Sequence, residues 1–114
     1  MSHGGIALGA HGERRAAQWY RSNGYEVVAR NWRCVFGELD LIARRGTLVV
    51  IAEVKTRASA RFGVPAEAVG LAKQRKLRRL AAVWLAESPV RYDDVRFDVV
   101  AIIGNDVEVI PAAF

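Results

Sequence analysis

Two apolar stretches of this chain are interrupted by charged residues that can act together. The first stretch holds Asp40, and the second holds Glu53 and Lys55. Both have the length and composition of buried β-strands. The connection over residues 44–47, Arg-Arg-Gly-Thr, contains glycine, as short hairpin loops commonly do. We therefore expect a β-hairpin in which two carboxylates and one ammonium group share a face.

The register of this hairpin determines how close the carboxylates lie. With a loop of even length, Asp40 lies directly opposite Glu53 or one diagonal away on the same face. With a four-residue loop, we expect Asp40 directly opposite Glu53 and Glu38 opposite Lys55. With a two-residue loop, we expect Asp40 one diagonal away from Glu53. Lys55 shares the face of Glu53 because side chains alternate along a strand. Like charges in this arrangement destabilise a sheet unless a cation binds between them, so the pair predicts a divalent metal site.

A divalent cation held by carboxylates is suited to phosphodiester hydrolysis. Mg²⁺ binds carboxylate, phosphate and water oxygens, and it activates water while neutralising phosphate charge. Asp40 and Glu53 are hard oxygen ligands, and the backbone carbonyl of Val54 offers a further ligand from the same strand. Lys55 can orient the attacking water or stabilise the charge that develops on phosphorus. The expected cofactor is Mg²⁺, with Mn²⁺ as the alternative.

A further carboxylate is expected to approach from a helix over residues 9–23, which Gly24 would terminate. The inward face of this helix follows the i, i+3, i+4, i+7 spacing and holds Glu13, Ala16, Ala17 and Tyr20. Glu13 could complete the metal shell directly or through water. It could equally be a peripheral residue of the first turn, and both interpretations stay open at this point.

The charge of the chain favours a polyanionic partner. The formal net charge is +5 and the isoelectric point is near 10. An acidic pocket in a basic chain is the pattern expected of an enzyme that uses a metal to cut a phosphate backbone. Part of the basic cluster in the second helix could instead be a solvated face. The residues that we expect to bind nucleic acid are Arg57, Arg61, Lys73, Arg75 and Arg79.

Length and composition limit the remaining classes. A chain of 114 residues predicts a single domain, residues 1–114, with residues 1–8 as a loose N-terminal segment. There is no apolar run near the roughly 20 residues of a membrane span, and the first residues do not resemble a signal peptide. The lone Cys34 agrees with a reducing compartment. We expect a cytoplasmic protein without a membrane partner.

The remaining elements complete an α/β fold. Strands are expected over residues 25–30, 38–43, 48–54, 95–103 and 107–110, and a second helix from Pro65 to Glu87 with a break near Gly70. Residues 31–37 form either a loop or strand extensions that meet at a turn. Asp98 is expected to be structural and to neutralise Arg96 or another basic residue near the site. The order predicts a mixed central β-sheet flanked by helices.

The motifs together resemble a known nuclease family. Asp40 and the Glu53-Val54-Lys55 motif resemble the motif of the PD-(D/E)XK superfamily. Many members have a proline directly before the aspartate, whereas this chain has Leu39 there. The wider match is to the YraN-like family of small bacterial proteins, related to archaeal Holliday-junction resolvases. It includes Gly12-Glu13, Asn31-Trp32-Arg33, Gly37 to Ile42, Glu53 to Arg57, Phe62-Gly63, Lys73 and Arg96 to Val100.

This resemblance implies a restriction-endonuclease-like αβββαβ core, here with an extra C-terminal strand. It implies that Glu13, Asp40 and Glu53 are metal ligands and that Lys55 is catalytic. It favours DNA over RNA, including branched or recombination intermediates, and a homodimer. The leading hypothesis is therefore a metal-dependent DNA nuclease. The alternative is a non-catalytic nucleic-acid-binding module with a degenerate nuclease site that keeps the acidic face. A separate, purely structural interpretation of Glu53 and Lys55 is an ion pair on an exposed sheet face.

Overall fold

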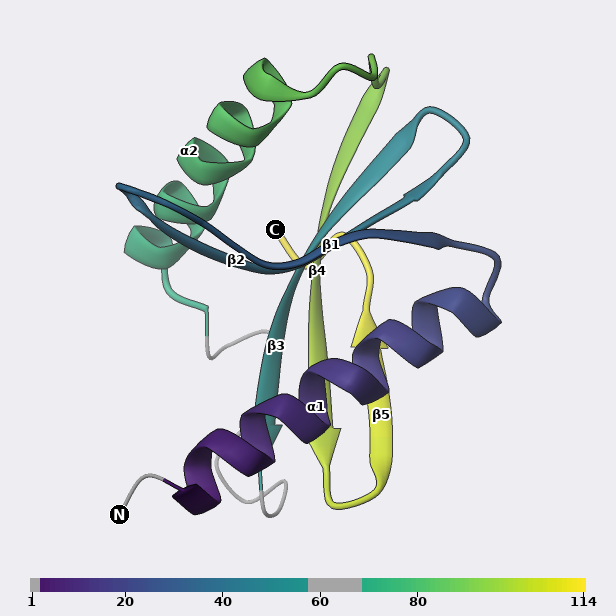
Figure 1. Cartoon of the computed structure of the whole chain (residues 1–114), viewed down its shortest axis with the longest axis vertical. Coiled ribbons are helices and arrows are strands. Elements are labelled where there is room, and N and C mark those ends of the chain that lie inside the picture. Colours follow the sequence, from purple (N-terminus) through teal and green to yellow (C-terminus); the bar gives the residue numbers. More distant parts are fainter. Residues whose placement is uncertain (1–2, 58–68) are drawn as a thin grey trace.

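The computed structural model of the chain has a five-stranded mixed sheet and two helices, and it describes residues 3–57 and 69–114 (Figure 1). The elements are α1 (His3–Ser22), β1 (Glu26–Cys34), β2 (Gly37–Arg45), β3 (Leu48–Arg57), α2 (Leu71–Glu87), β4 (Asp94–Ile103) and β5 (Asp106–Ile110). This order confirms the expected α/β class, the αβββαβ core and the extra C-terminal strand. No helix within the described ranges is long and apolar enough to cross a bilayer.

The strands lie in the order β1-β2-β3-β4-β5. Neighbouring strands are antiparallel except for β3 and β4, which run parallel from the Leu48–Asp94 pair to the Arg57–Ile103 pair. The segment that contains α2 makes the crossover between these two strands, as parallel neighbours require. Consequently α2 lies across the sheet from α1, and each helix covers one face (Figure 1).

The two faces carry separate hydrophobic cores because side chains alternate along the central strands. On β3, Val49 and Ile51 pack toward α2, whereas Val50 and Ala52 pack toward α1. The core under α2 includes Leu77, Leu80, Ala81, Trp84, Phe97 and Val99. The core under α1 includes Ala16, Ala17, Tyr20, Leu41, Val100 and Ile102. The inward face expected for the first helix is therefore confirmed at its three apolar positions.

The β2–β3 hairpin has a two-residue turn, Gly46-Thr47, between the pairs Arg45–Leu48 and Leu41–Ala52. Continued by one residue, this register places Asp40 directly across from Glu53. The expectation that this direct pairing of Asp40 with Glu53 requires a four-residue loop is therefore wrong. A two-residue loop produces the direct pairing. The backbone ladder stops at Leu41–Ala52, where β2 turns away from β3 (Figure 1). The split between the strands opens at the position of Asp40.

The β1–β2 pair extends further than expected. Residues 31–37 are strand extensions that meet at the turn Val35-Phe36, so the loop alternative is excluded. Asn31 interrupts β1 with φ of 52°, a left-handed conformation that asparagine adopts more readily than most residues. The paired residues Arg30–Leu41 and Trp32–Leu39 flank this interruption, which lies beside Asp40. The distortion therefore falls at the level of the candidate site.

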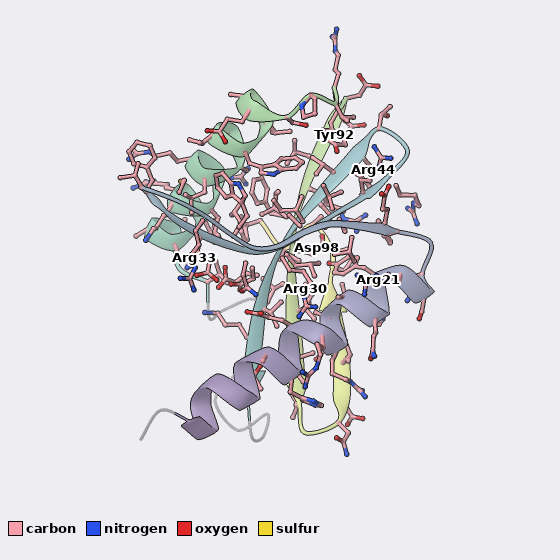
Figure 2. The ribbon with its side chains drawn as sticks, in the orientation of Figure 1. Arg21, Arg30, Arg33, Arg44, Tyr92 and Asp98 are labelled. Atoms are coloured by element: carbon pink, nitrogen blue, oxygen red, sulfur yellow. The ribbon has the colours of Figure 1, made fainter. Side chains whose placement is uncertain are left out.

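Asp98 holds β4 to its neighbours from a fully buried position near the centre of the molecule (Figure 2). Its carboxylate accepts hydrogen bonds from Tyr20 Oη at 2.7 Å, from Arg96 Nε at 2.8 Å and Nη2 at 2.9 Å, and from the Ala112 backbone N–H at 3.0 Å. Burial, together with the charge of Asp98, raises the pKa of Tyr20. A buried charge is tolerated when it is paired and hydrogen-bonded in this way, and the expected structural role of Asp98 is confirmed.

Helix boundaries differ from the sequence prediction at both N-termini. Helix α1 begins at His3, so the expectation of a loose segment over residues 1–8 is wrong for residues 3–8. The spacing of apolar residues in this glycine-rich stretch is too weak to indicate a helix. Helix α2 begins at Leu71 after Gly70, which has extended backbone angles. Pro65, expected to open that helix, lies outside the described residues.

Candidate metal and phosphate site

Asp40 is at the centre of the candidate site because it occupies the split between β2 and β3. Its Oδ2 accepts a hydrogen bond of 2.9 Å from the backbone N–H of Val54. This side-chain bond satisfies a donor that the interrupted ladder would otherwise leave unpaired. In an extended strand the N–H and C=O of one residue point to the same edge, so the carbonyl of Val54 is expected to face the same gap.

Two further carboxylates lie beside Asp40. One carboxylate oxygen from each of Glu13, Glu38 and Asp40 lies within 4.8 Å of the other two, and all three residues are partly buried. These separations are short enough for a single divalent cation to contact oxygens from more than one of the three residues. Glu13 reaches this position from α1, and Glu38 reaches it from β2.

Glu13 is positioned by its neighbours. Asn31 Nδ2 donates a hydrogen bond of 2.6 Å to Glu13 Oε2, so the residue that distorts β1 also orients this carboxylate. The preceding Gly12 lies against β3, where an added Cβ would fall 2.3 Å from Thr56 Oγ1. A larger residue at position 12 would therefore push α1 away from the sheet and move Glu13. Its place at the site follows from tight helix-to-sheet packing and supports the inward interpretation.

Glu53 lies on the other side of Asp40 and is only 7% exposed. After burial, its negative charge is the main cause of the raised pKa of Asp40. Lys55 Nζ and Lys73 Nζ each lie 3.8 Å from Glu53 Oε1. Both lysines therefore reach Glu53 and offset part of the negative charge of the carboxylate pair. The ion pair is also not on an open sheet face, since Glu53 is buried.

Burial, together with the negative charge of the site, raises the pKa of Asp40. Burial and the negative charge of Glu53 raise this pKa from its ordinary value of 3.8 to about 6, while the hydrogen bond from Val54 opposes the shift. The folded protein therefore holds Asp40 in an environment that disfavours its ionised form. A divalent cation bound beside Asp40 would favour the ionised form.

We expect this raised pKa to appear as a pH-dependent loss of stability in the metal-free protein. An acid whose pKa is higher in the folded state binds more protons there, so stability falls as the pH rises from about 4 to about 6. Asp40→Asn removes that charge, and it should raise the free energy of unfolding above pH 7 by about 1 to 2 kcal/mol, allowing for partial exposure.

Urea unfolding at pH 5 and pH 8 in the presence of chelator would measure the difference. The stability gained from Asp40→Asn should shrink at pH 5, where native Asp40 is largely protonated. A gain of equal size at both pH values would show that the charge of Asp40 is not strained in the folded protein. Asp94→Asn, which removes an exposed carboxylate at the start of β4, is the control and should change little.

The site opens into a hollow of about 520 Å³ between the end of the β1–β2 hairpin and the first turns of α2. Its lining combines acidic and basic groups: Arg33, Cys34, Gly37, Glu38, Asp40, Lys73 and Lys76. Arg33 Nε forms an ion pair of 3.0 Å with Glu38, and it lies at the opposite end of the β1–β2 pair from Arg44 (Figure 2). All the lysines of the chain, Lys55, Lys73 and Lys76, lie at the site or its hollow.

The expected nucleic-acid-binding residues divide into three groups. Lys73 lies at the site through its contact with Glu53. Arg75 and Arg79 are exposed on α2 and line a neighbouring hollow. Arg57 ends β3, but its side chain is outside the described part of the chain, as is the whole of Arg61. The neighbouring Arg78 is directed elsewhere, because its guanidinium lies 4.8 Å from the centre of the Phe97 ring.

Sequence reasoning missed three contributors to this site. Glu38 was considered only as a partner of Lys55, although its spacing of two from Asp40 already indicated a shared strand face. Asn31 carried a signal as well, since a polar residue tolerant of left-handed angles stood between strand-like segments. Lys76 belonged to the recognised basic cluster, but only the packing of α2 against Gly37 places it in the hollow.

Comparison with known proteins gives the relationship of the chain. Residues 12–102 match the model of a family described as "Uncharacterised protein family UPF0102". A UPF0102 protein of Nocardia farcinica is 55% identical over 97 residues, covering 85% of this chain and 76% of the relative. One from Beutenbergia cavernae is 57% identical over 97 residues, with 85% and 82% covered, and one from Rhodococcus opacus is 52% identical over 103 residues, with 90% and 86% covered. The chain therefore belongs to the UPF0102 family, the YraN-like family that its motifs resembled.

Proposed function

We propose that this protein is a divalent-metal-dependent nuclease that hydrolyses phosphodiester bonds in DNA. The observation that carries the proposal is the position of Asp40, which the hairpin register sets across from Glu53 and whose carboxylate lies within 4.8 Å of those of Glu13 and Glu38. Four carboxylates around one split in a sheet, bordered by lysines, form a cation site at which a phosphate could also bind. A purely structural role does not explain why so much negative charge is held together.

The chemistry follows from these residues. A bound Mg²⁺ or Mn²⁺ would supply Lewis-acid stabilisation and a water of lowered pKa. Asp40, together with Glu13, Glu38, Glu53 and the carbonyl of Val54, provides the candidate oxygen ligands. The ion pair with Glu53 holds Lys55 at the site. There Lys55 can donate a hydrogen bond to a non-bridging phosphate oxygen or orient the attacking water. Lys73 adds positive charge at the same carboxylate. DNA in the cytoplasm would be the natural substrate, and a homodimer would present two such sites.

Incubation of the purified protein with labelled DNA tests the proposal. Linear duplex, single-stranded and four-way-junction DNA should each be offered with Mg²⁺, with Mn²⁺ and with chelator. The proposal expects cleavage of at least one substrate with either metal and none with chelator. If native protein binds these DNAs but cleaves none with either metal, the non-catalytic binding module is the better account.

The basic residues near the site should contribute to DNA binding by contacting phosphates. Lys73→Ala and Arg75→Ala are each expected to weaken binding to duplex DNA and to reduce the slope of log affinity against log salt by about 0.9 per lost contact. Fluorescence anisotropy at several salt concentrations measures both quantities. Arg91→Ala, an exposed arginine beyond the far end of α2, is the matched control and should leave the slope unchanged. Equal slopes for native protein and both site variants would identify this part of α2 as a solvated face.

A further inference from the structure

The turn between β1 and β2 exposes two large apolar side chains beside a basic surface. Val35 is 91% exposed and Phe36 is 56% exposed. Phe36 lines a hollow of about 320 Å³ with residues of α2, namely Ala72, Arg75, Lys76, Arg79 and Leu80. The hydrophobic core under α2 does not include Phe36. An aromatic ring left in water on a tip between cationic side chains therefore needs an explanation other than folding.

The backbone of the turn keeps this tip against α2. Gly37 has φ of 146°, in the region that favours glycine, and an added Cβ would lie 3.0 Å from Lys76 Cε. A side chain at position 37 would be strained at this φ and would displace the end of the Lys76 side chain. The close approach makes Lys76 common to both hollows, the one that holds Phe36 and the one that holds Asp40. One extended ligand could therefore contact both hollows across Lys76.

We propose that Phe36, with Arg75 and Arg79, binds a nucleotide whose base is unstacked, so that the preferred DNA contains an unpaired segment next to the duplex that is cut. This inference rests on the proposed function for the identity of the polymer. An aromatic face flanked by cations suits this ligand, because the ring stacks on any base while the guanidinium groups contact the phosphates. In intact duplex the bases are already stacked on one another, and Phe36 would remain in water.

The distance between Phe36 and Asp40 predicts where the DNA strand is cut relative to the unpaired base. Four residues of extended chain separate Phe36 from Asp40, or about 13 Å at about 3.3 Å per residue. That length corresponds to about four base-pair steps of B-form DNA. The scissile phosphate should therefore lie within about four nucleotides of the first unpaired base. Incision at a wider range of positions would contradict the inferred path.

Binding measurements test the inference without requiring cleavage. Two probes are compared in chelator, a blunt duplex and the same duplex with a single-stranded extension, each labelled for anisotropy. We expect native protein to prefer the extended probe and Phe36→Ala to lose about tenfold or more of its affinity for that probe alone. Phe36→Trp should retain the preference, whereas Phe36→Leu, apolar but not aromatic, should not. Val90→Ala, which shortens an exposed apolar side chain beyond the far end of α2, should behave like native protein.

A base analogue whose fluorescence is quenched by stacking, 2-aminopurine, gives an independent readout. Placed as the first unpaired base, it should be quenched by native protein and by Phe36→Trp but not by Phe36→Ala. Equal affinity of native protein for both probes, or equal losses on both for Phe36→Ala, would overturn the inference. So would a fall in molecular mass on Phe36→Ala, measured by light scattering, because the tip would then be a contact between two copies of the chain.

Failure of the inference is distinguishable from failure of the proposed function. If metal-dependent cleavage occurs equally on blunt and extended DNA and Phe36→Ala changes nothing, the nuclease proposal stands and the nucleotide subsite is rejected. If the extended probe is preferred in a Phe36-dependent way but no DNA is cleaved, the subsite stands and belongs to a binding module.

Discussion

Asp40→Asn should lose specific binding of Mn²⁺ and Mg²⁺ and lower metal-dependent cleavage by about 10³-fold or more. Asp40 adjoins every other carboxylate of the site, so its replacement removes the ligand that connects Glu53 with Glu13 and Glu38. Loss of several kcal/mol of metal-derived transition-state stabilisation corresponds to a factor of this size. Asparagine retains an oxygen that can accept from the Val54 N–H, so the fold should persist.

Calorimetric titration of metal into the native and variant proteins measures the first effect, and single-turnover cleavage measures the second. Asp94→Asn removes an exposed carboxylate from the start of β4 and should alter neither quantity. Equal metal affinity in native protein and Asp40→Asn would show that the cation binds elsewhere. The cluster would then have to be explained as a structural feature of the β2–β3 split.

Lys55→Ala separates an enzyme from a binding protein. The ammonium group of Lys55 lies 3.8 Å from Glu53 Oε1, close enough to act on a phosphate held beside that carboxylate. Because this group is positively charged, it cannot serve as a metal ligand. Cleavage should therefore fall by about 10²-fold or more, the scale for losing a positioned acid–base or electrostatic group. Metal affinity and DNA affinity should stay within a few-fold of native protein.

Two comparisons sharpen this prediction. Lys55→Arg should not restore full activity, because a guanidinium is larger and does not give up its proton. Lys73→Ala removes an ammonium group at the same distance from the same oxygen, so it reports the effect of charge alone. If Lys55→Ala and Lys73→Ala lower cleavage equally, Lys55 has no specific catalytic role. If Lys55→Ala mainly weakens DNA binding, the protein is better described as a binding module.

The shared face of the carboxylates could be predicted from the sequence because it depends on local rules. Alternation along β2 and β3 and an even-length turn suffice to bring Asp40, Glu53 and Lys55 together. Helical spacing likewise placed Glu13 on the inward face of α1. These relationships hold within one element or between neighbours in the chain, where geometry is nearly independent of the rest of the fold.

The contacts that could not be predicted all join segments distant in sequence. The approach of Lys73 to Glu53 depends on how α2 packs across β3, and no local pattern specifies that position. The approach of Glu13 to Glu38 and Asp40 depends on how α1 packs against the sheet and on the hydrogen bond from Asn31. The exposure of Phe36 became apparent only once residues 31–37 proved to be strand extensions, since a loop would have allowed its ring to fold inward.

Anomalous diffraction from crystals soaked in Mn²⁺ at pH 8 tests the central claim most directly, because it locates the cation without requiring activity. The account predicts one anomalous peak in the split between β2 and β3, coordinated by Asp40 at about 2.0 to 2.3 Å and by at least one of Glu13, Glu38 and Glu53. The same soak of Asp40→Asn crystals should show no peak there. A native crystal saturated with Mn²⁺ whose only peaks lie away from Asp40, with Lys55 and Lys73 still paired to Glu53, would contradict the account.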